Sequence, residues 1–94
     1  NKKIVIIGVA YKADISDTRE TPALEVINLL TKEQASVVWH DPLVHKFNNQ
    51  ESQEIKDQDI AVVLTLHKEI DVEKIKKLKY VFDCTNKLSW AENL

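Results

Sequence analysis

Glycine is nearly absent from this sequence: Gly8 is the only one in 94 residues. An average usage of about 7% would give about six or seven glycines in a chain of this length. A G-x-G-x-x-G dinucleotide fingerprint or a P-loop needs several closely spaced glycines, so the chain contains neither. Collagen-like chains, flexible linkers and Gly/Pro-rich disordered segments are excluded for the same reason.

Cysteine and long apolar runs are also scarce. Cys84 is the single cysteine, so it cannot form an internal disulfide, and we expect a reducing, cytoplasmic environment. No apolar run approaches the ~20 residues that a membrane-spanning helix needs, and we expect no signal peptide. The 13 basic and 15 acidic residues nearly balance, which argues against nucleic acid and anionic membranes as partners.

The chain does contain apolar runs that alternate with amphipathic segments. Strands rich in β-branched residues are predicted at 3–9, 36–40, 60–66 and 79–83. Helices are predicted at 23–33 and 72–78. Thr21 and Pro22 provide an N-cap and a first helical residue for the longer helix. The polar segment 45–58 is expected to hold a loop and a short helix, and 88–94 is expected to be a tail.

This alternation predicts an α/β three-layer sandwich, in which a mainly parallel, Rossmann-like sheet is flanked by helices. We expect one domain over residues 1–94, since the length suits a single core. Right-handed crossovers place the carboxyl ends of all the predicted strands at the same edge of the sheet. Open α/β sheets bind ligands along this edge, so polar residues that follow the strands form the candidate site.

The segment from Ala10 to Glu20, which follows the first predicted strand, is the most informative part of the chain. Connections of this type normally take about 2–6 residues, and longer ones are usually functional or disordered. Lys12 and Arg19 are its long cations and Tyr11 is its aromatic residue, and a predicted helix N-terminus follows. Without the glycines that bring a backbone up to a phosphate, side chains must reach it. The segment therefore favours an anionic, phosphorylated ligand.

A solvated loop is the alternative explanation for these charges. Lys12 and Arg19 can pair with Asp14, Asp17 or Glu20 instead of binding a ligand, since most charged surface loops are only solvated. Composition and spacing alone leave both interpretations open.

Residues 8–24, GVAYKADISDTRETPAL, carry a family resemblance. They resemble the signature G-x-[AS]-[FY]-K-x-[DN]-x-x-D-x-R-E-[ST]-x-[AS] that opens the C-terminal UDP-binding domain of the UDP-glucose/GDP-mannose dehydrogenase family. The run Trp39-His40-Asp41-Pro42 after the second predicted strand, and Asp83 at the end of the fourth, also look like this family. The resemblance covers nearly the whole chain.

The resemblance implies a fragment of an NAD-dependent nucleotide-sugar 6-dehydrogenase. Such an enzyme oxidises the C6 alcohol of the sugar to a carboxylate and supplies polysaccharide synthesis, capsule included. NAD is then bound mainly by an N-terminal Rossmann domain, and the catalytic cysteine lies in a central region, so this chain holds no catalytic residue and no metal. The implied partners are a UDP-sugar in preference to a GDP-sugar, the N-terminal and central domains of the parent chain, and further copies of the parent in a homo-oligomer.

The resemblance also implies roles for individual residues. Tyr11 and Lys12 match an aromatic–lysine pair that contacts the nucleotide sugar. Arg19 matches an arginine that reaches the NAD pyrophosphate from the opposing domain. Many members carry an arginine two residues after the aspartate that ends the fourth strand, where this chain has Thr85. Thr85 and Lys87 are therefore the candidate contacts on the sugar side.

Other chemistry-bearing residues have plainer explanations. Cys84 does not correspond to the family's catalytic cysteine, and we expect it to be a small apolar residue at a buried strand end. The histidines His40, His45 and His67 lack metal-ligand spacing, so we expect structural or solvent-exposed roles. Trp39 is expected in the core.

Two other functions fit a chain of alternating strands and helices. A receiver-like signalling domain needs an acidic cluster just after the first strand and an aspartate that ends the third, whereas these strands end in Val9-Ala10-Tyr11 and Leu66-His67, which excludes it. A non-catalytic Rossmann-like nucleotide-binding or interaction module remains as the alternative. The parent chain distinguishes the two, because in a dehydrogenase an N-terminal Rossmann domain and a catalytic cysteine precede this segment.

Overall fold

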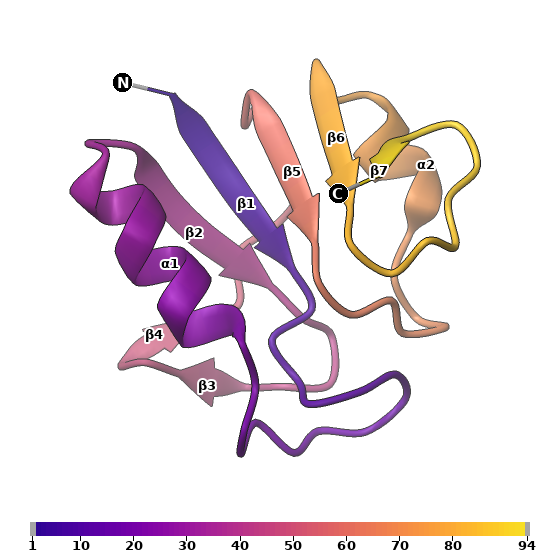
Figure 1. The fold of residues 1–94 in the computed structure, drawn as a ribbon. Helices are drawn as coiled ribbons and strands as arrows, with labels where there is room; N and C mark the ends of the chain where they lie inside the picture. The colour runs from indigo at the N-terminus through magenta and orange to yellow at the C-terminus, as the bar shows by residue number, and fades with distance from the viewer. Residues whose placement is uncertain (1, 94) are drawn as a thin grey trace.

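The computed structural model describes residues 2–93, which form a five-stranded, wholly parallel sheet in the order β2-β1-β5-β6-β7 (Figure 1). Its strands are β1 (Lys3–Ile7), β2 (Ser36–His40), β5 (Ile60–Val63), β6 (Tyr80–Asp83) and β7 (Glu92–Asn93). The helices are α1 (Ala23–Lys32) and α2 (Val72–Lys76). Asn1 and Leu94, the ends of the predicted domain, lie outside the described residues.

The sheet has a separate apolar core on each of its faces. Alternate residues of a strand point to opposite faces, and accordingly Ile6 packs in one cluster with Ile27 of α1. Its neighbour Ile7 packs in the other cluster with Ile75 of α2. The two helices therefore cover opposite faces, which confirms the predicted three-layer α/β sandwich.

The strand order places β1 between β2 and β5 and defines the edge where ligands bind. The chain passes from β1 to β2 on one side and then returns to β5 on the other. The direction of winding thus reverses between β1 and β5, and ligands of open α/β folds bind beyond the carboxyl ends of the strands at this reversal. The loops after β1 and β5 are the ones that meet there.

The segment predicted to hold a short helix forms a hairpin instead, so that prediction was wrong. Strands β3 (Lys46–Phe47) and β4 (Gln50–Glu51) pair antiparallel around Asn48 and Asn49, whose φ angles are 56° and 60°. Asparagine tolerates this left-handed conformation, which a tight two-residue hairpin turn requires. Beyond the hairpin, the Gln53 N–H donates to the Trp39 carbonyl at the outer edge of β2.

The ends of several elements also differ from the predicted ones. The strands β1 and β5 stop at Ile7 and Val63, before the ends of their apolar runs, because the chain turns into loops there. The predicted tail contains β7, which extends the sheet beside β6. The helix α1 begins at Ala23 with Pro22 at the N-cap, one residue later than predicted, and the Thr21 hydroxyl accepts a hydrogen bond from the Ala23 N–H. Across residues 2–93 no helix is long and apolar enough to cross a membrane.

Candidate functional site

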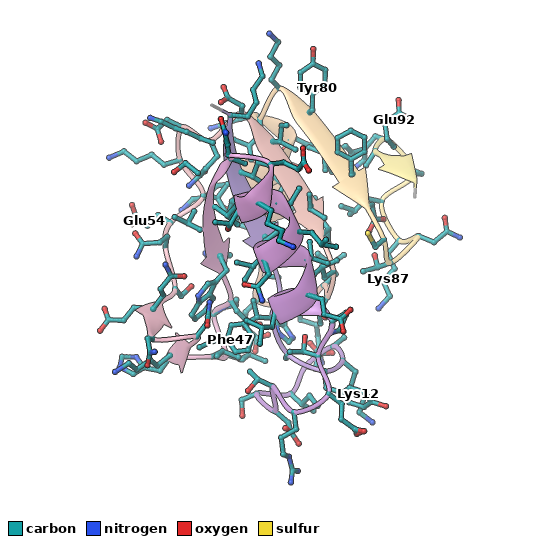
Figure 2. The ribbon with its side chains drawn as sticks, turned by 60° about the vertical axis from the view of Figure 1, so that its left-hand side comes forward. Lys12, Phe47, Glu54, Tyr80, Lys87 and Glu92 are labelled. Carbon is teal, nitrogen blue, oxygen red and sulfur yellow. The ribbon has the colours of Figure 1, made fainter. Side chains whose placement is uncertain are left out.

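The loop between β1 and α1, residues 8–22, lies beyond the carboxyl ends of the strands, where the sequence places the candidate site (Figure 1). Tyr11 is 53% exposed, and Lys12 and Arg19 are also exposed. Figure 2 shows Lys12 projecting from this loop, away from the sheet. An aromatic ring and two cations are therefore presented to solvent from one segment.

The lone glycine fixes how this loop leaves β1. Gly8 has a φ of +81°, and a Cβ atom there would lie 2.0 Å from the carbonyl oxygen of Thr65 in the next loop. The Thr65 hydroxyl then donates a hydrogen bond to the Ala10 carbonyl oxygen at 2.9 Å. The two loops approach so closely that only a residue without a side chain fits.

Arg19 is paired with Asp17 at the surface. Its Nε donates to Oδ1 at 3.0 Å and its Nη2 donates to Oδ2 at 2.7 Å. Hydrogen bonds from the Arg19 side chain and backbone hold the pKa of the Asp17 carboxyl at about 2, and the pairing raises the pKa of Arg19. Both side chains are therefore charged at neutral pH.

The pairing leaves part of the guanidinium available. Only the edge that carries Nε and Nη2 faces Asp17, and the Arg19 side chain is 86% exposed. Within residues 2–93 the Nη1 N–H groups have no hydrogen-bond partner. A guanidinium held on one edge in this way can still bind an anion through its other N–H groups.

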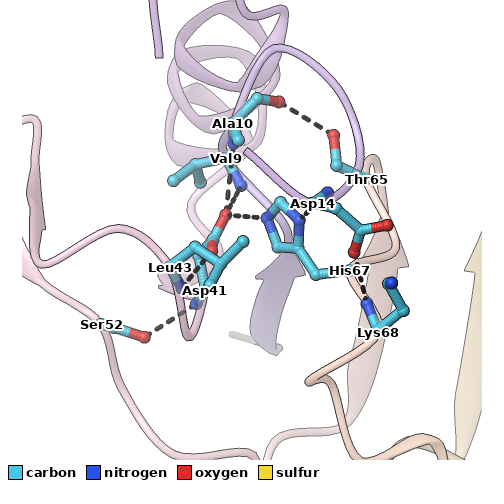
Figure 3. A network of polar contacts seen from close by, with 9 residues as sticks. All are labelled: Val9, Ala10, Asp14, Asp41, Leu43, Ser52, Thr65, His67 and Lys68. Carbon is cyan, nitrogen blue, oxygen red and sulfur yellow. Dashed lines mark hydrogen bonds and ion pairs between the residues drawn. The ribbon is translucent and has the colours of Figure 1, made fainter. Parts of the chain in front are cut away.

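A buried pair, Asp41 and His67, holds the two ends of the loop's first turn (Figure 3). Asp41, which follows β2 and is 1% exposed, accepts the Val9 N–H at 2.9 Å and the Ala10 N–H at 3.3 Å through Oδ2. The same oxygen lies 2.9 Å from Nε2 of His67, which follows β5. His67 Nδ1 in turn accepts the Asp14 N–H at 2.7 Å.

Sequence reasoning missed the contact between Asp41 and His67. The expected structural role of His67 is confirmed, because its side chain is fully buried, but its partner was not identified. Each residue follows one of the strands that flank β1, so the signal was a polar residue just after each of two apolar strands. That signal becomes readable only when the strand order is known.

Thr85 and Lys87 lie on a different loop, between β6 and β7 (Figure 2). Asp83, which is 1% exposed, accepts the hydroxyl and N–H of Thr85 through Oδ1. Its Oδ2 accepts the N–H groups of Lys87 and Leu88. The Thr85 hydroxyl is thus engaged within its own loop, whereas the Lys87 side chain is exposed. Across residues 2–93 no hydrogen bond or ion pair joins this loop to the β1–α1 loop.

The expectation that Cys84 is buried was wrong. The residue is exposed, because β6 ends at Asp83 and the chain turns toward solvent. Partial desolvation of the thiol and the negative charge of Asp83 raise its pKa. The thiol is therefore a poor nucleophile at neutral pH. Within residues 2–93 no group of three or more His, Cys, Asp or Glu side chains is placed to hold a metal ion.

Asp83→Asn is expected to lower the free energy of unfolding at pH 7 by about 1.5–3 kcal/mol, because hydrogen bonds to a charged acceptor are lost. Burial alone raises the pKa of Asp83, but the hydrogen bonds from Thr85, Leu88 and Lys87 outweigh it and hold the pKa below 3.8. The carboxylate therefore stabilises the fold above pH 3.8, and this contribution fades as the pH falls further.

Urea unfolding of Asp83→Asn at pH 7 and at about pH 3 tests this, since the difference from the original chain should shrink at the lower pH. Asp57→Asn is the matched control, because Asp57 forms only an exposed 3.9 Å ion pair with Lys3. A destabilisation of Asp83→Asn that is equal at both pH values contradicts the prediction.

The chain is similar to known proteins over nearly all of its length. The model of the UDP-glucose/GDP-mannose dehydrogenase family, UDP binding domain, matches residues 5–89. A UDP-N-acetyl-D-mannosamine dehydrogenase from Methanococcus aeolicus is 36% identical over 107 residues, which cover 98% of this chain and 24% of that protein. UDP-glucose 6-dehydrogenase 1 from Arabidopsis thaliana is 51% identical over 43 residues, which cover 46% of this chain and 9% of that protein.

Solved structures share the fold. The UDP-N-acetyl-mannosamine dehydrogenase Cap5O from Staphylococcus aureus matches with a TM-score of 0.74 at 29% identity, over 99% of this chain and 26% of that one. The chain thus spans about a quarter of the length of such dehydrogenases. The family match includes the whole β1–α1 loop and the loop that follows β6 up to residue 89. The chain therefore belongs to the UDP-glucose/GDP-mannose dehydrogenase family, as its UDP binding domain.

Proposed function

We propose that residues 1–94 form a single nucleotide-sugar-binding domain within an NAD-dependent UDP-sugar 6-dehydrogenase. The whole enzyme oxidises the C6 alcohol of a UDP-linked sugar to a carboxylate and supplies polysaccharide synthesis, such as that of a capsule, in the cytoplasm. The match of residues 5–89 to the UDP binding domain carries this proposal. The N-terminal and central domains of the parent chain then provide most of the NAD site and the catalytic residues. The parent chain also forms a homo-oligomer in this proposal.

The exposed side chains of the β1–α1 loop support a role in binding the nucleotide. Lys12 offers a point positive charge to the diphosphate, and the half-exposed ring of Tyr11 can stack on or cover a ring of the ligand. Arg19, held on one edge by Asp17, offers its remaining N–H groups to the pyrophosphate of NAD. Such contacts between a charged donor and a phosphate are among the stronger hydrogen bonds in proteins.

The β6–β7 loop supports a role on the sugar side. Lys87 is exposed there, whereas the Thr85 hydroxyl bonds to Asp83. Lys87 is therefore the stronger candidate for a direct sugar contact, and Thr85 shapes the loop that presents it. No catalytic role is proposed for Cys84, because its raised pKa opposes nucleophilic attack.

A substrate panel on the full-length protein tests the proposed function. UDP-glucose, UDP-N-acetylglucosamine, UDP-N-acetylmannosamine and GDP-mannose are each supplied with NAD, and NADH formation is followed by its absorbance. We expect one UDP-sugar to be oxidised, and we expect residues 1–94 alone to oxidise none. No NADH from any of these substrates, or turnover by the isolated chain, contradicts the proposal.

In the same full-length enzyme Lys12→Ala should raise the KM for the UDP-sugar, and Arg19→Ala should raise the KM for NAD. A lost hydrogen bond to a charged group corresponds to about 1.5–3 kcal/mol, or about a 10- to 150-fold change. Lys32→Ala, an exposed lysine in the last turn of α1, is the matched control and should change neither KM. The residue roles are refuted if both KM values stay at their original level or if both variants affect the same ligand.

A further inference from the structure

The first turn of the β1–α1 loop is tied at both ends to one buried pair of side chains (Figure 3). At the start, Asp41 accepts the N–H groups of Val9 and Ala10. At the end, His67 accepts the N–H of Asp14, and the two side chains meet at 2.9 Å. The segment 11–13, which carries Tyr11 and Lys12, spans the distance between these ties.

The hydrogen bonds define the form of the His67 ring. A backbone N–H can only donate, so Nδ1, which lies 2.7 Å from the Asp14 nitrogen, is an unprotonated acceptor. The ring proton is then on Nε2, which donates to Asp41 Oδ2. The imidazole is therefore neutral and relays the position of the Asp41 carboxylate to the backbone at Asp14. Because the Asp41 and His67 side chains are fully buried, water has no access to replace the bond between them.

A second contact at Asp14 strengthens the tie. Its Oδ1 accepts the Lys68 N–H at 2.9 Å. Asp14 therefore both donates a hydrogen bond to the loop after β5 and accepts one from it. Asp14 has a φ of 64°, a left-handed conformation that aspartate enters more readily than most residues with a side chain and that local hydrogen bonds support. The two hydrogen bonds with His67 and Lys68 provide that support.

We propose that Asp41 and His67 are positioning residues for nucleotide binding, which set the direction in which Tyr11 and Lys12 leave the loop. This inference rests on the proposed function, because it assumes that these two side chains contact the UDP-sugar. Asp41 and His67 are buried and touch no ligand themselves. Their effect on binding passes through the backbone of residues 9–14.

Two substitutions of His67 separate its two hydrogen bonds. Asparagine places an amide oxygen near the position of Nδ1 and keeps an acceptor for the Asp14 N–H, but it loses the bond to Asp41. Glutamine places an amide nitrogen near the position of Nε2 and keeps the donor to Asp41, but it loses the acceptor.

In the full-length enzyme we expect His67→Gln to raise the KM for the UDP-sugar about tenfold, with kcat changed less than about twofold. The reason is that a binding contact common to ground and transition states is lost. We expect His67→Asn to raise it by less than about threefold.

Asp14 provides a second pair of variants that keep the buried core unchanged. Asp14→Gly accepts the positive φ without strain but loses the acceptor for the Lys68 N–H, whereas Asp14→Asn retains an acceptor and tolerates the conformation. Asp14→Gly should raise the KM for the UDP-sugar about threefold, and Asp14→Asn should leave it unchanged. If His67→Gln does not fold, which thermal unfolding reveals, the Asp14 pair decides the question.

Titration of the unsubstituted full-length enzyme with UDP by calorimetry distinguishes a failure of the proposed function from a failure of the positioning role. If UDP does not bind, the proposed function fails whatever the variants do. If UDP binds, equal KM values for the two His67 variants, or no change in Asp14→Gly, overturn the positioning role. A loss of kcat without a change in KM also overturns it, since that outcome places the effect outside binding.

Discussion

Replacing Gly8 with alanine is expected to lower the free energy of unfolding by about 3–5 kcal/mol, from overpacking and a strained backbone together. The added Cβ would lie 2.0 Å from the carbonyl oxygen of Thr65 and 2.7 Å from its carbonyl carbon. Backbone atoms cannot swing aside as a flexible side chain can, so β1 and β5 must separate at their carboxyl ends. The φ of +81° adds a conformational penalty for any residue with a side chain.

Urea unfolding of residues 1–94, followed by tryptophan fluorescence, measures this change, since unfolding exposes the buried Trp39. Ser16→Ala is the control, since it introduces the same methyl side chain at an exposed position of the same loop. The expected loss is a large part of the roughly 5–15 kcal/mol that holds a typical domain folded. A loss below about 1 kcal/mol would show that the two loops can move apart without strain.

Asp41→Asn is expected to lower the free energy of unfolding by a similar amount, about 3–5 kcal/mol, because more than one buried donor loses its acceptor at about 1–3 kcal/mol each. The carboxylate is 1% exposed and accepts hydrogen bonds from His67 and from the N–H groups of Val9, Ala10 and Leu43. An asparagine has the same shape, but its amide group must turn N–H donors toward groups that also donate. The substitution thus leaves buried donors without an acceptor, and a buried polar group without a partner is strongly unfavourable.

The same urea experiment tests Asp41→Asn, with Asp71→Asn as its matched control. Asp71 caps α2 by accepting the Glu73 N–H at the surface, and asparagine caps a helix about as well as aspartate. We expect the control to change the free energy of unfolding by less than about 0.5 kcal/mol. Equal effects of the two substitutions would mean that the Asp41 hydrogen bonds contribute no more than those of an exposed cap.

The fold could be predicted from the sequence because its signals are local. The apolar runs beginning at Ile4 and Ile60 each define a strand that is covered on both faces, and the spacing from Ala23 onward defines the longer helix. The hairpin at Asn48 was missed although its signal is also local, since two adjacent asparagines favour the left-handed turn. The two-residue strand β7 carries too little pattern to be recognised without its neighbour β6.

The candidate site could be predicted only where its residues are adjacent in the chain. Tyr11, Lys12 and Arg19 share one loop, so a single segment identifies them. Asp41 and His67 are 26 positions apart, and they meet because β2 and β5 both lie beside β1. A contact of this kind follows from the strand order, which the spacing of apolar residues does not specify.

The pairing of Arg19 with Asp17 shows that charges of the loop bind each other, and it leaves part of the guanidinium available. Asp17 neutralises one edge of the guanidinium, as a solvated ion pair does, and leaves the other edge exposed. The ion pair and the proposed contact with a phosphate are therefore compatible in the same side chain. An arginine held in this way has fewer rotamers to lose when it meets a phosphate.

The contact between Gln53 and the outer edge of β2 bears on the solubility of the chain. An uncovered edge strand exposes N–H and carbonyl groups that can pair with a strand of another molecule and start aggregation. Here the Gln53 N–H occupies the Trp39 carbonyl at 2.8 Å, and the Asp41 N–H donates to the Ser52 hydroxyl just beyond the strand. The segment that follows the hairpin thus closes the carboxyl half of β2 to intermolecular pairing. Shortening the hairpin would reopen that edge and make the chain prone to form cross-β aggregates.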